Sequence, residues 1–363
     1  MPLLLKSLLC FMLAASGAEA AVPTASAALA QGAVDAMMTF YDGATGLWDP
    51  GAPWWQSGLA LQAVLGFMAK TGNRDYMWEA NYTIQAQRRP LAWWPEGGGE
   101  FRAESTDDTG WWALAAIAMY ELTGDAELLE IARKDEEYMY RYWTDGPPCG
   151  GGLVWNVPTR SYHNAISNEL YLLLAATLHN LIPGDTVYLQ RSLREWDWFR
   201  RSGMINADNL INDGLTDGAA CVNNNNPTWT YNQGIILGGL VELYKATCDR
   251  TYLTAARSIA DAVVSSPALM WEGILTEPCP SAGECEPDGV AFKGIFMGQL
   301  AKLDGVLSDR PYRALIRRNA EEMHSRARNA AGFYGGAWQE PFDSASIGRQ
   351  ASAAHLFVAA LDT

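Results

Sequence analysis

The sequence predicts an all-α protein whose helical hairpins close into a six-membered ring, an (α/α)6 toroid. Segments that are apolar around the whole circumference of a helix recur along the chain, and helices of this kind are buried. They alternate with amphipathic, charged segments that must face solvent on one side. Strand-like alternation of apolar and polar residues is scarce. At 363 residues and 49% hydrophobic content, the chain can bury the core that this fold requires.

The first twenty residues have the features of a secretory signal. Lys6 precedes a short apolar run at 7–15, and the Ala-Glu-Ala triplet at 18–20 has the small-x-small form that signal peptidase cuts. We therefore expect residues 1–20 to be removed and residues 21–363 to form a single (α/α)6 domain. The mature protein is expected to be secreted, either into the medium or into a cell wall.

The rest of the chain carries no membrane signal. No later apolar run combines the ~20 residues needed to cross a bilayer with freedom from polar breaks. The last residues, 359–363, lack the polar spacer and hydrophobic tail of a lipid-anchor signal. We expect a monomer without a membrane span.

The helices of the ring can be placed in order. An opening helix at about 25–41 supplies one outer member. The six buried helices are predicted at 55–70, 110–123, 163–181, 231–247, 291–306 and 349–361. The charged outer helices include 125–143, 186–202, 250–265 and 310–329. Tight turns with Asn or Asp, which we expect to cap the helix that follows, lie at 71–73, 123–125, 183–185, 247–249 and 307–309.

This alternation determines where a functional site can lie. All inner helices run parallel, so their N-termini open on one face of the ring. Aromatic and hydrogen-bonding residues precede or begin every inner helix, in the segments 53–56, 107–112, 162–168, 228–234, 292–294 and 346–350. Long loops at 93–96, 212–215 and 335–340 are expected to converge on the same face. The sequence therefore predicts a cleft lined by aromatic and polar side chains.

Two adjacent carboxylates, Asp107 and Asp108, stand at the start of the second buried helix, just ahead of Trp111 and Trp112. Glycoside hydrolysis needs two carboxyl groups a few ångströms apart, and indole rings provide flat apolar faces for sugars. Asp is also common at helix starts for structural reasons alone. The joint placement of aromatic and polar residues around the same face favours the catalytic interpretation.

The other candidate residues belong to the segments around the predicted cleft. We expect Trp54, Trp94 and Trp112 to stack on sugar rings. The candidates for binding sugar hydroxyl groups are His163, Asn164, Asn168, Asp213, Tyr231, Asn232 and Lys293.

Charge and cysteine content exclude some classes of ligand. A formal charge of -15 argues against nucleic acid, which is bound through Lys and Arg, and suits a neutral polymer. We expect no cofactor and no zinc, because the chain lacks a Cys-x-x-Cys motif and its four histidines are scattered. Cys279 and Cys285 are the best disulfide candidates, while the pairing of Cys149, Cys221 and Cys248 is open. The triplet Asn81-Tyr82-Thr83 is a possible N-glycosylation site.

These motifs resemble glycoside hydrolase family 76, the endo-α-1,6-mannanases, over nearly all of the mature chain. The resemblance rests on the aspartate pair and Gly110-Trp111-Trp112, and on the segments 162–168, 213–214, 230–234 and 292–294. It implies an (α/α)6 catalytic domain that hydrolyses α-1,6-linked mannan or manno-oligosaccharides with retention of configuration. It also implies that Asp107 is the nucleophile and Asp108 the general acid/base. The Cys- and Asn-rich segment 221–227 departs from the common family pattern.

Other functions remain open at this point. The same toroid could belong to another glycosidase, to a cell-wall transglycosidase, or to a sugar epimerase that uses His163 as a base. A non-catalytic carbohydrate-binding protein, in which the aspartates only cap a helix, is an alternative of a different class. Formation of new reducing ends from linear α-1,6-mannan would distinguish an enzyme from a binding protein.

Overall fold

The computed structural model describes residues 24–279 and 285–362, and it confirms the ring of helical hairpins. The predicted signal at residues 1–20 lies outside the described residues. The inner helices are α3 (Trp54–Thr71), α5 (Thr106–Thr123), α7 (Ala165–Leu181), α9 (Thr230–Thr247), α11 (Gly289–Val306) and α13 (Ile347–Ala359). The outer helices are α2 (Thr24–Met38), α4 (Met77–Gln87), α6 (Ala126–Tyr140), α8 (Val187–Phe199), α10 (Arg250–Ser265) and α12 (Arg313–Arg326).

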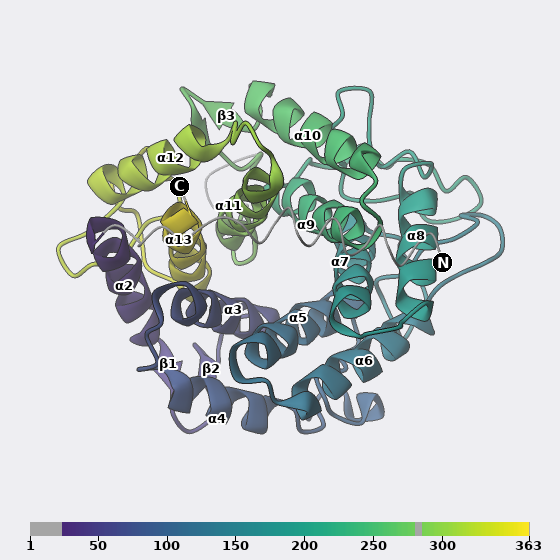
Figure 1. Cartoon of the computed structure of the whole chain (residues 1–363), viewed down its shortest axis with the longest axis horizontal. Helices are drawn as coiled ribbons and strands as arrows, with labels where there is room; N and C mark the ends of the chain where they lie inside the picture. The colour runs from purple at the N-terminus through teal and green to yellow at the C-terminus, as the bar shows by residue number, and fades with distance from the viewer. Residues whose placement is uncertain (1–23, 280–284, 363) are drawn as a thin grey trace.

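Each inner helix packs against the next, and α13 packs against α3, so the inner ring is closed (Figure 1). Every outer helix lies against an inner one. The first helix, α2, packs against the last inner helix, α13. The other regular elements of the described residues are two small antiparallel hairpins and two short 3-10 turns: β1 (Tyr41–Asp42) with β2 (Leu47–Trp48), β3 (Met270–Trp271) with β4 (Ile274–Leu275), η1 (Pro95–Gly97) and η2 (Ala360–Asp362).

The helix boundaries differ from the predicted ones where capping was misread. Helix α5 begins at Thr106 rather than at 110, which places the two aspartates inside its first turn. Asp125 and Asp249 cap the following outer helices as predicted, each accepting a hydrogen bond from a backbone N–H two residues later. Asn73 and Asp309 do not cap helices, because α4 and α12 begin several residues further on, after Tyr76 and Tyr312.

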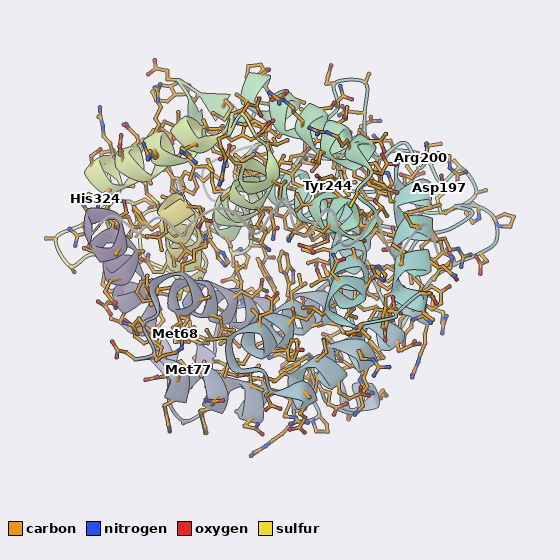
Figure 2. All side chains as sticks on the ribbon, viewed as in Figure 1. Met68, Met77, Asp197, Arg200, Tyr244 and His324 are labelled. Atoms are coloured by element: carbon orange, nitrogen blue, oxygen red, sulfur yellow. A yellow bond between two sulfur atoms is a disulfide. The ribbon has the colours of Figure 1, made fainter. Side chains whose placement is uncertain are left out.

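The core is formed by the inner helices and the inward faces of the outer ones. Most charged side chains lie outside it, but Asp135, Glu136, Glu169, Glu195, Lys293 and Asp304 are buried. On α8, Asp197 pairs with Arg200 and Arg201, and the labelled residues Asp197 and Arg200 lie on the outer ring in Figure 2. None of the described helices combines the length and the apolar character that crossing a bilayer would demand.

Among the described residues, two disulfides tie loops to the ring. Cys279 is bonded to Cys285, which confirms the predicted pair. Cys149 is bonded to Cys221 across 72 residues, with their Cα atoms 5.3 Å apart, and this excludes a bond between Cys221 and Cys248. The second bridge joins the loop after α6 to the Asn-rich segment before α9.

The inner helices approach each other at backbone distance, and glycine makes this possible. A Cβ on Gly294 of α11 would lie 2.4 Å from the carbonyl oxygen of Ser352 on α13. A Cβ on Gly234 of α9 would lie 2.6 Å from the Cα of Phe296 on α11. Because these neighbours are backbone atoms, they cannot rotate away from an added side chain.

We expect Gly294→Ala to lower the free energy of unfolding by about 1–3 kcal/mol, because it forces α11 and α13 apart. Gly298→Ala, one turn later on the same helix, is the matched control. The nearest atom to its added Cβ is 3.7 Å away, so the gain in helix propensity should stabilise the protein by about 0.5–1 kcal/mol. Urea denaturation of both variants measures the difference; equal effects of the two would contradict the packing argument.

Candidate active site

The first turn of α5 is held by hydrogen bonds to the loop at 153–157. Thr106 donates from its backbone N to the Trp155 carbonyl, 3.1 Å, and from its hydroxyl to the Val154 carbonyl, 3.0 Å. The hydroxyl of Thr109 accepts from the backbone N of Ala103 and donates to the Ser105 carbonyl. These buried bonds fix the turn from both sides, so the aspartates between the two threonines have a defined orientation.

Asp107 and Asp108 are half-buried at this turn, at the N-terminal end of the inner helices. Asp107 accepts a hydrogen bond from the backbone N–H of Asp108, 3.0 Å. The N-terminus of a helix favours negative charge, so this position helps to keep the Asp107 carboxylate ionised. Ser105 precedes the helix without capping its backbone and instead hydrogen-bonds to the aspartates through its side chain.

The two carboxyl groups titrate differently. Desolvation raises the pKa of Asp107 to about 6, opposed by hydrogen bonds from the backbone, from Ser105 and from Trp155. Desolvation raises the pKa of Asp108 well above its usual range, and the charges of Asp107, Glu104 and Asp288 raise it further. The pair therefore combines a carboxyl group whose pKa is raised to about 6 with one whose pKa is raised by burial and by three neighbouring negative charges, a difference that nucleophile and acid roles require.

A third carboxylate, Asp213, is connected to the pair through Tyr231, which interacts electrostatically with both Asp213 and Asp107. The hydroxyl of Tyr162 and the side chain of Trp229 hydrogen-bond to Asp213, whose pKa is raised by burial. Gly214 allows this arrangement, because a Cβ there would lie 2.7 Å from both the His163 carbonyl and the Tyr162 hydroxyl.

Tyr231 and Asp288 complete the group of charged and aromatic residues around the pair. The ring of Tyr231 stacks on Phe292 with centroids 3.7 Å apart. Burial raises the pKa of Tyr231 well above its usual value, and the charges of Asp213, Asp107 and Asp288 raise it further. Asp288 accepts hydrogen bonds from the indole of Trp55, 2.9 Å, and the amide of Gln56, 3.4 Å. The structure thus brings together the predicted residues Asp107, Asp108, Asp213 and Tyr231.

The three tryptophans predicted to stack on sugar rings are buried or partly buried and contact other side chains of the protein. Trp112 is fully buried between Trp54, 4.8 Å away by ring centroids, and Phe101, 5.1 Å away. Neither face of Trp112 is free, so it supports Trp54 rather than contacting a sugar. Trp54 is 9% exposed and donates to Gln87. Trp94 is partly buried, and its indole donates to the hydroxyl of Tyr138.

Several residues predicted to bind sugar hydroxyl groups instead form hydrogen bonds within the protein. Asn164 caps α7, and the amide of Asn168 bonds to the backbone of Leu153 and of Asn164. Burial lowers the pKa of His163, whose ring bonds to Thr144 and contacts the sulfur of Cys149. These three residues shape the loops behind the site.

Asn232 and Lys293 are buried as well. Asn232 is fully buried, and neither amide atom has a partner among the described residues. Lys293 donates to the Gly336 carbonyl, 2.7 Å, and its ammonium lies 4.7 Å from the ring centre of Trp338. Burial lowers the pKa of Lys293 to about 8.

The most exposed aromatic residues near the pair were not among the predicted site residues. Trp93 is 55% exposed, packs edge-on against Trp54 and donates to Glu104, 3.1 Å. Trp155 is 37% exposed and hydrogen-bonds to Asp107. Trp93 lies in the loop at 93–96, which the sequence predicts on this face of the ring. Trp155 had no sequence signal, because its position depends on the loop pairing at 153–157.

A metal site needs several His, Cys, Asp or Glu side chains whose ligand atoms lie close together. In the described part of the chain, one group of potential ligands is close enough, namely Cys149, His163 and Cys221. Both sulfurs of this group are already joined to each other.

A ring of parallel inner helices, with two unlike carboxyl groups and exposed indoles at their N-terminal end, defines a protein of the (α/α)6 glycosidase class. Comparison with known proteins identifies the family. The sequence profile of glycosyl hydrolase family 76 matches residues 25–362, and the chain belongs to this family.

Curated relatives carry related names. The chain is 28% identical over 278 residues to the mannan endo-1,6-alpha-mannosidase DFG5 of Saccharomyces cerevisiae, covering 72% of this chain and 59% of that protein. It is 26% identical over 276 residues to the protein of the same name in Candida albicans, covering 70% and 59%. The chain spans about three fifths of the length of the curated relatives it matches.

Solved structures share the fold. One is an inactive variant of the α-1,6-mannanase GH76A of Salegentibacter sp., with two consecutive aspartates replaced by asparagine, in complex with α-1,6-mannotriose. It has a TM-score of 0.82 and 22% identity, covering 93% of this chain and 99% of that one. Another is Dfg5 of Chaetomium thermophilum in complex with glucosamine, with a TM-score of 0.81 and 20% identity, covering 93% and 90%.

We expect Trp155→Phe to raise the pKa of Asp107 above about 6, because the indole donor that favours the ionised form is lost. The carboxyl ¹³C signals of the aspartates, followed by NMR through a pH titration, measure this shift. Trp93→Phe is the matched control, since that indole donates to Glu104 instead. A shift of equal size in both variants would show that general solvation, not the Trp155 hydrogen bond, sets the pKa.

Proposed function

We propose that this protein is a secreted glycoside hydrolase that cleaves α-1,6-mannosidic linkages in mannan and retains the anomeric configuration. The observation that carries the proposal is the pair Asp107 and Asp108, fixed in the first turn of α5 with unlike pKa values. Membership of family 76 supports the reaction class, and the names of the relatives support the linkage. The inactive mannanase variant, altered at two consecutive aspartates, supports the residue assignment.

The chemistry follows from the difference between the two carboxyl groups. The ionised Asp107 attacks the anomeric carbon, and the bond from that carbon to the leaving oxygen breaks. Asp108 donates its proton to the departing oxygen. In the second step Asp108 accepts a proton from water, the water oxygen bonds to the anomeric carbon, and the bond to Asp107 breaks.

The roles are not interchangeable. Asp107 receives the hydrogen bonds that favour the ionised form, from Trp155, Ser105 and the helix backbone. Asp108 is close to three negative charges, which favour its protonated form. This assigns the nucleophile to Asp107 and the acid/base to Asp108.

The surroundings suit a neutral sugar polymer. The aromatic faces available for stacking are those of Trp93 and Trp155, and Asp213 and Tyr231 are close enough to the pair to bind sugar hydroxyls. An epimerase that uses His163 as its base fits less well, because that ring is engaged by Thr144 and Cys149.

We expect Asp107→Asn and Asp108→Asn each to lower kcat on linear α-1,6-mannan by roughly three orders of magnitude or more, while the protein stays folded. Release of reducing ends measures the rate, and circular dichroism checks the fold. Asp125→Asn, at an exposed helix cap, is the control and should keep near-normal turnover. Bound but uncut mannan with the unaltered protein would replace this proposal by a carbohydrate-binding function.

We expect kcat/KM to have a bell-shaped dependence on pH. The reaction needs ionised Asp107, so activity is lost as the pH falls through about 6. It also needs protonated Asp108, so activity is lost again as the pH rises through the raised pKa of that carboxyl group. Initial rates between pH 4 and 9 give the profile; activity that stays constant down to pH 4 would contradict the assigned role of Asp107.

A further inference from the structure

A cavity of about 570 Å³ lies in the middle of the ring, at the end opposite to the aspartate pair. Side chains from all six inner helices line it, and its rim consists of residues late in those helices, including Lys70, Glu121, Lys245 and Lys302. Because the inner helices run parallel, these residues mark the C-terminal end of the ring. The volume lies in the range of about 300–1,000 Å³ that is usual for small-molecule sites.

A layer of aromatic rings separates this cavity from the candidate active site. Trp55 stacks on Trp111, with centroids 5.5 Å apart, and lies 6.2 Å from Phe292, which stacks on Tyr231. Of these four residues only Trp111 lines the cavity, and neither Asp107 nor Asp108 does. The cavity is therefore a separate compartment.

The inner walls of the cavity are apolar, with isolated polar groups. Leu59, Leu114 and Ile295 contribute hydrocarbon surface. Gln299 is 9% exposed, and its Oε1 has no hydrogen-bond partner among the described residues. Its carboxamide lies against Gly238, where a Cβ would approach Oε1 to 2.3 Å. A buried amide without a partner costs free energy, which a bound ligand can recover.

The polar groups of the cavity include both donors and acceptors. Within the described residues, no hydrogen bond or ion pair joins Lys302 or Glu121 to another side chain, although the two charges are close enough to interact. His355 contacts the Leu59 carbonyl through Nε2, 3.1 Å, and burial lowers the pKa of His355 to about 4. The neutral ring therefore donates through Nε2 and leaves Nδ1 as an acceptor.

This combination selects the chemistry of the ligand. An inorganic anion would meet the cationic side chains of Lys70, Arg74, Lys245 and Lys302 but also the carboxylates of Glu121, Glu242 and Asp362 in the same cavity, so the lining of mixed charge matches a neutral ligand better. A purely apolar ligand would leave the amide of Gln299 unpaired. Hydroxyl groups both donate and accept, and the C–H faces of a sugar ring pack on aliphatic walls. We propose that the cavity binds a short neutral saccharide, separately from the aspartate pair.

Calorimetric titration of the full chain with α-1,6-mannobiose tests this proposal. Asp107→Asn and Asp108→Asn together provide a host that cannot cleave the sugar. We expect two saccharides to bind per chain, one at each end of the ring. Gly298→Leu should remove one of them, because its added side chain fills the cavity from a position with room for a Cβ. Gln299→Met should weaken the same binding step by about tenfold.

Two further variants and a second disaccharide complete the experiment. Lys302→Met removes a charge from the cavity without changing its volume greatly. Trp271→Ala, at an exposed position on the β3–β4 hairpin, is the control and should leave saccharide binding unchanged. If isomaltose binds equally well at the cavity, the site accepts short saccharides in general. If only mannobiose binds, the site recognises the product of the proposed reaction.

The two proposals fail in different ways. A single saccharide per chain that is lost in Gly298→Leu supports the cavity and argues against binding at the aspartate pair. Binding that neither Gly298→Leu, Gln299→Met nor Lys302→Met alters, with either disaccharide, overturns the proposal for the cavity.

Discussion

Backbone-to-backbone packing of the parallel inner helices is the constraint on which the rest of this structure depends. Gly234 and Gly294 leave no room for side chains between neighbouring helices, so the inner ring is closed and its members stay parallel. Parallel helices place all their N-termini at one end. The residues that begin each inner helix therefore meet, although they are separated by tens of residues in the sequence.

At that end, electrostatics assign different properties to two identical side chains. Burial makes both carboxyl groups harder to ionise. The hydrogen bonds of Trp155 and the start of α5 offset it for Asp107 only. For Asp108, burial and the charges of Asp107, Glu104 and Asp288 favour the protonated form. Acid and nucleophile thus differ through their neighbours, not through residue type.

The sequence was sufficient for the ring because the buried helices differ so clearly from the amphipathic ones in hydrophobic pattern. Among the predicted site residues, Asp107, Asp108 and Tyr231 adjoin inner-helix starts, and Asp213 lies in a loop expected to converge on the same face. The prediction failed where a side chain points inward rather than outward: nothing in the sequence distinguishes Trp112, which is enclosed by Trp54 and Phe101, from Trp93, which is exposed. Trp155 was missed because loop pairing, which has no periodic pattern, brings it to Asp107.

The contact between α2 and α13 has a consequence for how the molecule is made. The first helix of the ring packs against the last inner helix, so during synthesis α2 lacks this partner until α13 has left the ribosome. Until then α3 also lacks one of its two inner neighbours. The toroid therefore cannot be completed hairpin by hairpin like an open solenoid, and its final closure brings α2 and α13 together.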